Sequence, residues 1–169
     1  MTIVEFDGIT PKIDHSVIIL KGCTILGRVE IGPDTVIYPG TIIRGDTAKV
    51  KIGSKVVIQD GVMINSSAGN NCKIGDNSLI AFGSILHGTV VGNNCVIGIR
   101  SILMPGTRVK DNSMIGAMSY VLRGTVPEGK VYVGIPAVEK RDMMDKDHNM
   151  WDLGKKTFRD IALKYKKSS

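Results

Sequence analysis

The chain has 169 residues, 43% of them hydrophobic but only 5% aromatic, which predicts one domain with an aliphatic core. Its formal charge of +6 is concentrated at one end, because residues 155–169 carry six basic side chains against Asp160, a local charge of +5. The rest of the chain is nearly neutral and has few aromatic residues for stacking, which argues against nucleic-acid binding. It also has no apolar run of about 18 residues, so we expect no membrane span.

The cysteines and the first residues indicate the compartment. Cys23, Cys72 and Cys95 form no C-x-x-C pair, and an odd number of cysteines is unlike a secreted disulfide framework. The opening segment MTIVEFDGITPK contains Glu5 and Asp7 and has no apolar stretch of the kind a signal peptide needs. We therefore expect a cytoplasmic protein, with Cys72 and Cys95 as unreactive thiols of the core.

An aliphatic residue recurs every six positions, with three changes of step. The eighteen positions are Ile13, Ile19, Ile25, Ile31, Ile37, Ile43, Ile52, Ile58, Ile64, Ile74, Ile80, Leu86, Val91, Ile97, Leu103, Val109, Ile115 and Val121. The position four residues further on is always small or β-branched, and glycine often follows the aliphatic residue. A period of six is typical of a short strand followed by a tight corner. Three such units close a triangular coil, and stacked coils pair as parallel strands around one continuous core.

The repeat predicts an all-β fold, a parallel β-helix of about six triangular coils over residues 1–137. After Val126 the pattern stops. Residues 138–169 alternate charged and apolar side chains at roughly helical spacing, although Gly154 is a residue that can interrupt a helix. We expect a C-terminal α-helical segment on the flank of the β-helix, with Trp151 and Phe158 as packing residues.

The register of the repeat places polar side chains in a column. The residue that follows each inward aliphatic residue points outward, which stacks Arg44, Asn65 and His87 across successive coils. The longer steps of the repeat fall at residues 46–51 and 66–73, so loops protrude beside this column. We expect the functional site at this edge.

Three segments resemble γ-class carbonic anhydrases at matching intervals. They read I-I-R-G-D (Ile42–Asp46), I-Q-D-G (Ile58–Gly61) and I-L-H-G (Ile85–Gly88). The similarity extends over roughly residues 10–140. It implies the hexapeptide-repeat, left-handed β-helix superfamily, and the left-handed winding is taken from this resemblance.

In that family a zinc ion lies between subunits of a homotrimer and is held by three histidines, two from adjacent coils of one subunit and one from its neighbour. By position these fall on Asn65, His87 and Phe82, so only His87 is a histidine. Catalytic zinc needs three good ligands and an open place for water, whereas Phe82 has no lone pair and Asn65 offers a neutral amide. We expect no cofactor, with zinc or another divalent metal only if the site is still occupied.

The resemblance also implies roles for four other residues. Arg44 and Asp46 correspond to an inter-subunit ion pair, and Gln59 and Asp60 to the polar pair that orients the metal-bound water. Gln59, Asp60 and His87 are thus the candidate catalytic residues. The alternatives are interface contacts for the charged residues, a satisfied buried amide for Gln59, and for His87 either a relic packed against Phe82 or a general base.

Three functions remain open at this point. The first is a γ-carbonic-anhydrase-like homotrimer with a degenerate zinc site that is non-catalytic or has an altered function. The second is an active carbonic anhydrase with a rearranged metal site. The third is a hexapeptide-repeat acyltransferase, such as an acetyltransferase, in which His87 activates an acceptor hydroxyl. The sequence does not identify a small-molecule ligand.

Overall fold

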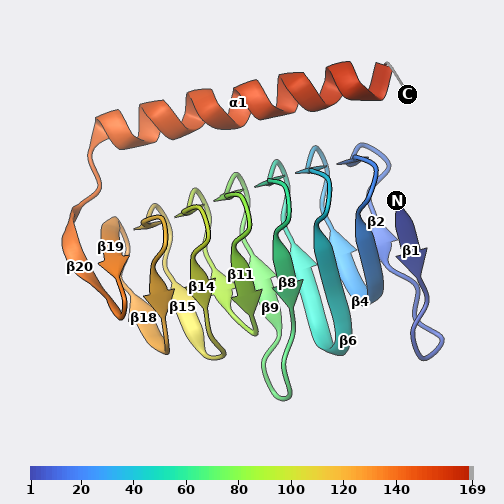
Figure 1. Cartoon of the computed structure of the whole chain (residues 1–169), viewed down its shortest axis with the longest axis horizontal. Helices are drawn as coiled ribbons and strands as arrows, with labels where there is room; N and C mark the ends of the chain where they lie inside the picture. The colour runs from blue at the N-terminus through green and yellow to red at the C-terminus, as the bar shows by residue number, and fades with distance from the viewer. Residues whose placement is uncertain (168–169) are drawn as a thin grey trace.

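A computed structural model describes residues 1–167 as a triangular β-helix with one long helix lying along it (Figure 1). The three sides are called faces 1, 2 and 3 in the order in which the chain first passes through them. Each face has seven parallel strands, so the β-helix has seven coils. This confirms the predicted fold class, with one coil more than the sequence indicated. Ser168 and Ser169, the end of the predicted helical segment, lie outside the described residues.

The strands are short because each side of the triangle is short. Face 1 consists of β1 (Thr2–Val4), the first halves of β4 (Thr24–Ile31) and β6 (Ile42–Ile52), β8 (Met63–Asn65), β11 (Ile85–His87), β14 (Ile102–Leu103) and β17 (Tyr120–Val121). Face 2 consists of β2 (Lys12–Ile13), the second halves of β4 and β6, β9 (Cys72–Ile74), β12 (Val90–Val91), β15 (Thr107–Val109) and β18 (Gly124–Val126). Face 3 consists of β3 (Ile18–Ile19), β5 (Val36–Ile37), β7 (Val57–Ile58), β10 (Leu79–Ile80), β13 (Val96–Ile97), β16 (Met114–Ile115) and β19 (Lys130–Gly134).

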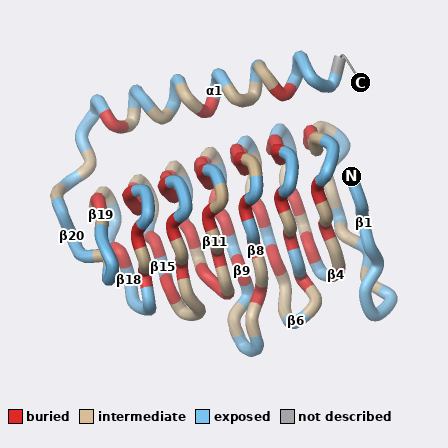
Figure 2. Tube along the Cα trace, viewed as in Figure 1, coloured by how far each residue is buried: buried red, intermediate tan, exposed pale blue. Residues whose placement is uncertain are grey.

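The repeating aliphatic residues form the core. Their side chains point into the triangle and stack in register, as in the pairings of Ile43 with Ile64, Ile64 with Leu86, and Leu86 with Leu103. These four side chains are completely buried, and buried positions recur in every coil (Figure 2). The core is aliphatic, as the composition predicted, because each coil adds inward side chains to columns that no single coil could bury.

The corners explain why the position four residues after each repeating aliphatic residue is always small or β-branched. Ser84 is fully buried, and its hydroxyl donates to the carbonyl oxygens of Ala81 at 2.7 Å and of Gly98, one coil further, at 2.8 Å. A Cβ on Gly98 would come within 2.5 Å of the Ala117 backbone nitrogen. Small residues are required here because backbones of adjacent coils meet closely at the corners.

The end of the chain leaves the β-helix through β20 (Ala137–Asp142), which pairs antiparallel with β19. The helix α1 follows, spans Asp145–Lys167 and continues through Gly154 without a break. The predicted start of the helix near Val138 is therefore wrong, because backbone pairing with β19 holds these residues as a strand. No helix in the described part of the chain is long and apolar enough to cross a membrane.

Face 3 is apolar on its outer side, and α1 covers it. Tyr38, Val57 and Leu79 are buried there together with Ala162 of the helix. The ring of Phe158 packs edge-on against Tyr38 at a centroid distance of 5.6 Å, and the Tyr38 hydroxyl donates to the Phe158 carbonyl oxygen at 2.7 Å. Trp151 also packs against this cluster. Trp151 and Phe158 are therefore packing residues, as expected.

Candidate functional site

The column predicted from the repeat exists. In the parallel ladders of face 1, Arg44 pairs with Asn65 and Asn65 pairs with His87. Asn65 and His87 end their strands, and Arg44 ends the first half of β6, so all three lie beside the corner between faces 1 and 2. The other two histidines are elsewhere: His15 precedes face 3 in the first coil, and His148 lies on α1.

Two buried polar atoms beside this column have no hydrogen-bond partner among the described residues, namely Asn65 Oδ1 and Ser67 Oγ. They lie where the loop between β8 and β9 begins. The loop itself is ordered by backbone hydrogen bonds between Ser67 and Asn70, at 3.0 and 2.9 Å. A Cβ on Gly88 would come within 2.5 Å of Ser67 Oγ, so the chain after His87 passes directly over this loop. A buried acceptor without a donor is costly unless a ligand or another chain supplies one.

Arg44 and Asp46 form an ion pair within one chain. Arg44 Nη2 donates to Asp46 Oδ2 at 2.5 Å, and Nε donates to the same oxygen at 3.2 Å. The hydrogen bond from Arg44 lowers the pKa of Asp46 below its ordinary value. The side chain of Arg44 is about half exposed, so its remaining N–H donors are accessible.

Gln59, Asp60 and Phe82 lie at the opposite edge of face 1, at the corner with face 3. Gln59 is almost fully buried, and its Oε1 accepts a hydrogen bond from the Phe82 backbone N–H at 3.2 Å. The structure therefore does not bring this group together with Asn65 and His87 within one chain. A strand of face 1 separates the two groups, so a site that combines them needs two subunits.

Phe82 is a contact of the helix in the single chain. Its ring lies 6.0 Å from the ring of Phe158, at an interplanar angle of 73°. Phe82 nevertheless keeps 37% of its surface exposed. Burial, with a smaller contribution from the charge of Asp60, raises the pKa of nearby Tyr38 to about 12.

The donor set does not suit zinc. Within the described residues no group of three or more His, Cys, Asp and Glu side chains is placed to hold a metal ion. Beside His87 the neighbouring coil offers only the Asn65 amide, and Phe82 offers no donor atom at the third position. Zinc prefers imidazole and thiolate ligands, so these residues do not fit a catalytic zinc site.

The three thiols are poor nucleophiles. Cys23, Cys72 and Cys95 are each at most 1% exposed. Burial raises the pKa of all three, that of Cys95 to about 11. A thiol with a raised pKa carries almost no thiolate at neutral pH. The thiols therefore belong to the core and add nothing to the chemistry of the site.

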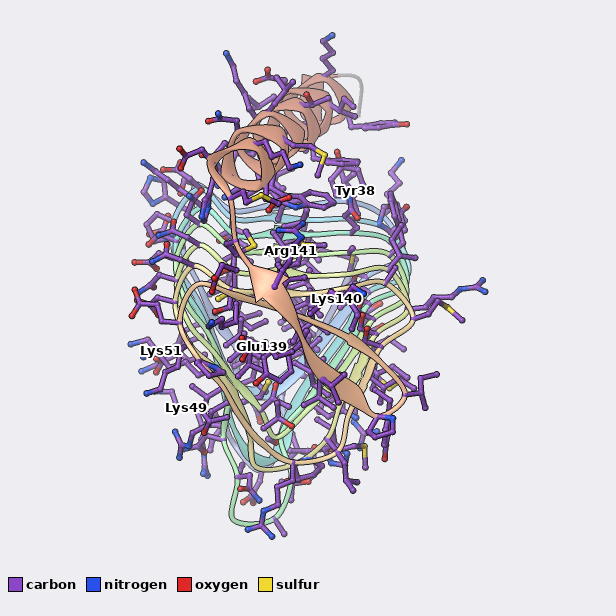
Figure 3. The ribbon with its side chains drawn as sticks, turned by 90° about the vertical axis from the view of Figure 1, so that its left-hand side faces the viewer. Tyr38, Lys49, Lys51, Glu139, Lys140 and Arg141 are labelled. Carbon is purple, nitrogen blue, oxygen red and sulfur yellow. The ribbon has the colours of Figure 1, made fainter. Side chains whose placement is uncertain are left out.

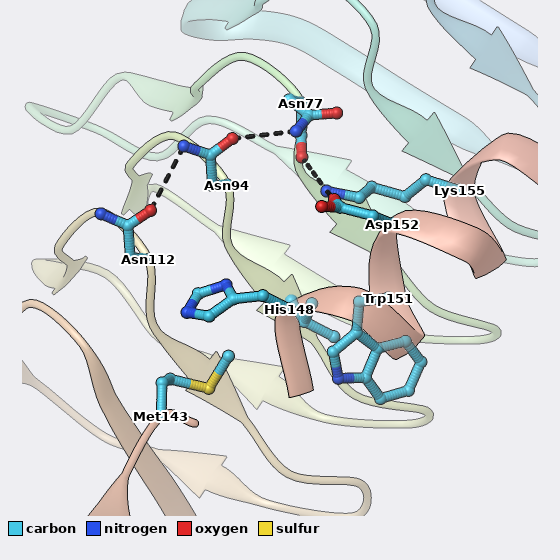
Figure 4. Close-up of a pocket in the computed structure, with 9 residues that line it drawn as sticks. Asn77, Asn94, Asn112, Met143, His148, Trp151, Asp152 and Lys155 are labelled. Atoms are coloured by element: carbon cyan, nitrogen blue, oxygen red, sulfur yellow. Dashed lines mark hydrogen bonds and ion pairs between the residues drawn. The ribbon is translucent and has the colours of Figure 1, made fainter. Parts of the chain in front are cut away.

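Sequence reasoning missed a ladder of asparagines at the corner between faces 2 and 3. Asn77 Nδ2 donates to Asn94 Oδ1 at 2.9 Å, and Asn94 Nδ2 donates to Asn112 Oδ1 at 3.2 Å (Figure 4). Asn112 Nδ2 in turn donates to Glu128 Oε1 at 3.2 Å. The three asparagines have positive φ values between 53° and 56°, a conformation that asparagine tolerates better than most residues. Lys155 of α1 donates to the Asn77 carbonyl oxygen at 2.8 Å. The recurring pairs Asp76-Asn77, Asn93-Asn94 and Asp111-Asn112 were the available signal.

The stacked triangular coils, the small corner residues and the covering helix define a hexapeptide-repeat β-helix protein. A family model described as bacterial transferase hexapeptide (six repeats) matches residues 88–123. The carnitine operon protein CaiE of Salmonella agona is 28% identical over 165 residues, covering 97% of this chain and 83% of the relative. CaiE of Escherichia coli K12 is 27% identical, covering 96% of this chain and 83% of the relative.

Two solved structures share the whole architecture. A candidate acetyltransferase from Bacillus cereus matches with a TM-score of 0.96 and 27% identity, over 99% of this chain and 98% of the other. A hexapeptide transferase family protein from Anaplasma phagocytophilum matches with a TM-score of 0.92 and 29% identity, over 97% and 98% of the two chains. The chain is thus a hexapeptide-repeat β-helix protein that is similar to CaiE over nearly its whole length.

Proposed function

We propose that the protein is a cytoplasmic γ-carbonic-anhydrase-like homotrimer with a degenerate metal site, and that it does not hydrate CO2. One observation carries the proposal: the neighbour of His87 in the ladder is Asn65, an amide, and the third position is Phe82. Zinc lowers the pKa of its bound water to about 7 only when it is held with an open coordination place. A lone histidine cannot hold it in that way.

Exposed apolar side chains on and beside face 1 support the trimer. Met63 is 36% exposed, Phe82 37%, Ile99 45% and Met118 59%. The last three recur at the corner of three successive coils between faces 3 and 1, and Met63 lies on face 1 itself. Contiguous exposed apolar side chains of this kind are typical of protein interfaces. A closed three-fold arrangement would cover the corner of one subunit with face 1 of the next.

Such an arrangement also explains the two separated groups of polar residues. Asn65 and His87 lie at one edge of face 1, and Gln59, Asp60 and Phe82 at the other. Contact between different edges of two subunits would bring these groups together at each interface. The unpartnered Asn65 Oδ1 would then face a neighbouring chain or a ligand.

Metal analysis and light scattering test this proposal. The purified full-length chain is expected to have three times the monomer mass at micromolar concentration and no stoichiometric metal after dialysis against zinc. Asn65→His places a second imidazole beside His87 and is the matched variant for the metal analysis. One zinc per wild-type subunit, together with CO2 hydration that His87→Ala abolishes, would instead establish an active enzyme with a rearranged site. A monomer would contradict the trimer.

Acyl transfer is the second candidate, favoured by the relation to the Bacillus cereus and Anaplasma proteins named above. His87 would take the proton of an acceptor hydroxyl or amine as its oxygen or nitrogen bonds to the acyl carbonyl carbon, while the thioester C–S bond breaks and coenzyme A leaves as the thiol. With an amine acceptor, a second N–H would donate to Asn65 Oδ1. The thiols contribute nothing to this chemistry because they are buried. Calorimetric titration with acetyl-CoA tests the idea, and the absence of binding to the assembled protein eliminates it.

A further inference from the structure

A cavity of about 360 Å³ lies between the asparagine corner of the β-helix and the first turns of α1. The ladder of Asn77, Asn94 and Asn112 forms one wall. His148 and Trp151 of the helix line the cavity from the other side (Figure 4). The cavity lies at a different corner of the triangle from the Asn65–His87 column, so a ligand bound in it would be independent of the proposed function.

The asparagine wall offers hydrogen-bond donors. Each ladder hydrogen bond takes one N–H of an amide group and one lone pair of the next acceptor. The second N–H of each amide takes no part in the ladder. Because the hydrogen bonds link the three side chains to one another, their orientation is fixed before any ligand arrives.

Trp151 supplies a donor that has no partner. Its Nε1 is buried and makes no hydrogen bond with the described residues. In Figure 4 the edge of the indole ring that carries Nε1 is turned toward the side on which His148 and Met143 lie. A buried N–H without an acceptor is rare in folded proteins, and a ligand, an ion or an ordered water usually supplies the acceptor.

Lys155 of α1 adds a positive charge to the lining of the cavity. Its side chain is only 4% exposed, and it pairs with Asp152 at 2.9 Å. The Asp152 side chain is 63% exposed and lines the cavity at its rim. The ammonium group also donates to the Asn77 carbonyl oxygen, and one of its three N–H donors remains. The cavity thus combines a buried cation, its partner Asp152 at the rim and several N–H donors with the apolar side chains of Val96 and Met143.

We propose that this cavity binds a short-chain carboxylate. A carboxylate only accepts hydrogen bonds, so it would pair with the N–H groups of the asparagines that the ladder leaves free. Its charge complements Lys155, and charge-assisted hydrogen bonds are the stronger kind. A short alkyl chain would contact Val96, Met143 and the indole ring. The ligand would bridge α1 and the β-helix and would therefore hold the helix more firmly on face 3.

The chain contains a single tryptophan, Trp151, which gives a direct measurement. The indole N–H of the 15N-labelled full-length protein produces one resonance, and we would titrate it with butyrate. We expect a saturable downfield shift at millimolar concentration, because a new acceptor deshields the proton. Butyramide has the same chain without the charge and is expected to bind more weakly. n-Butylamine, which has the same chain and a cationic head group, is expected to leave the resonance unmoved.

Two variants locate the carboxylate. Asp152→Asn removes the negative charge at the rim and should tighten butyrate binding several-fold, and circular dichroism checks that the variant is folded. Met150→Ala, an exposed residue of the same helix, serves as the control and should bind as the wild type does. An indole resonance that does not respond to butyrate, or responds equally to n-butylamine, overturns the proposal. If Asp152→Asn binds butyrate with unchanged or weaker affinity, the ligand's carboxylate does not lie beside Lys155.

Discussion

Asn65 and His87 are direct partners in the parallel ladder between β8 and β11, and Asn65 Oδ1 is buried beside His87 without a hydrogen-bond donor among the described residues. Two side chains that leave adjacent parallel strands at paired positions lie about 4.8 Å apart at the backbone. That spacing suits two ligands of one metal ion. The identity of the side chain, and not the backbone geometry, therefore decides whether a metal binds here.

Restoring the missing imidazoles should restore the metal. In the double variant Asn65→His, Phe82→His, each subunit interface of the proposed trimer would hold three histidines. We expect about one zinc per subunit after dialysis, measured by atomic emission, and about none in Phe82→His alone. A double variant that remains a trimer and takes up no zinc would contradict the proposed geometry. The wild-type protein is the control for adventitious binding.

The N-terminal end of α1 should make stability depend on pH. Asp147 accepts hydrogen bonds from Arg141 Nη1 at 2.6 Å and from the Met144 backbone N–H at 3.0 Å. The hydrogen bond from Arg141 lowers the pKa of Asp147. This carboxylate therefore stabilises the fold above its unfolded pKa of about 3.9, and the stabilisation is lost as pH falls through the lower folded value.

Asp147→Asn should accordingly lower Tm by roughly 2–4 °C at pH 7, the size expected for one capping interaction in a chain of this length. The difference from the wild-type protein should shrink as the solution is acidified below pH 4. Thermal unfolding followed by circular dichroism across this range measures both effects. A gap that stays constant down to the acid limit would show that the carboxylate charge is irrelevant.

Two glycine substitutions should have opposite effects. Gly154 lies inside α1, and a Cβ added to it would meet no other atom within 4 Å. Gly154→Ala should stabilise the protein by about 1 kcal/mol, because alanine costs less helical entropy. Gly98→Ala places a Cβ within 2.5 Å of the Ala117 backbone nitrogen and should destabilise by about 1–3 kcal/mol. Urea unfolding of both variants measures the difference, and equal effects would contradict the close approach of the coils.

The docking of α1 on face 3 should depend on Tyr38. Tyr38→Phe keeps the ring contact with Phe158 and removes only the hydrogen bond to its carbonyl oxygen, so we expect a loss of about 1 kcal/mol. Tyr38→Ala removes both and should cost about 3–5 kcal/mol. Denaturant unfolding measures these losses. Equal losses in the two variants would mean that the ring contributes nothing to the docking.

The register of the β-helix could be predicted because it follows from two repeats, the alternation of side chains in a strand and the length of a coil. Side chains alternate within a strand, and the coil repeats after three short strands, so the sequence alone placed Arg44, Asn65 and His87 in one column. The coil number was one too low because the repeat was counted only from Ile13 to Val121. The structure adds β1, β18 and β19, whose residues include Ile3, Val126 and Tyr132.

The rest of the site depends on contacts that a linear repeat does not carry. Residues 138–142 have the charge pattern of a helix surface, yet pairing with β19 makes them a strand. The cavity at Trp151 exists only because α1 packs beside the asparagine corner. The spacing of apolar residues in α1 does not show at which corner of the β-helix the helix packs. The roles predicted for Gln59, Asp60 and His87 stay predictions, since they require a second subunit.

The hairpin of β19 and β20 has a consequence for solubility. A solenoid of parallel strands ends in unpaired backbone groups, and identical ends invite stacking of molecules into fibres. Here β20 runs in the opposite direction across the last coil and carries Glu139, Lys140 and Arg141 (Figure 3). An approaching molecule would meet a reversed strand and a charged rim instead of a matching coil. The residues of β20, which lead the chain to α1, thus prevent the β-helix from extending by end-to-end association with another molecule.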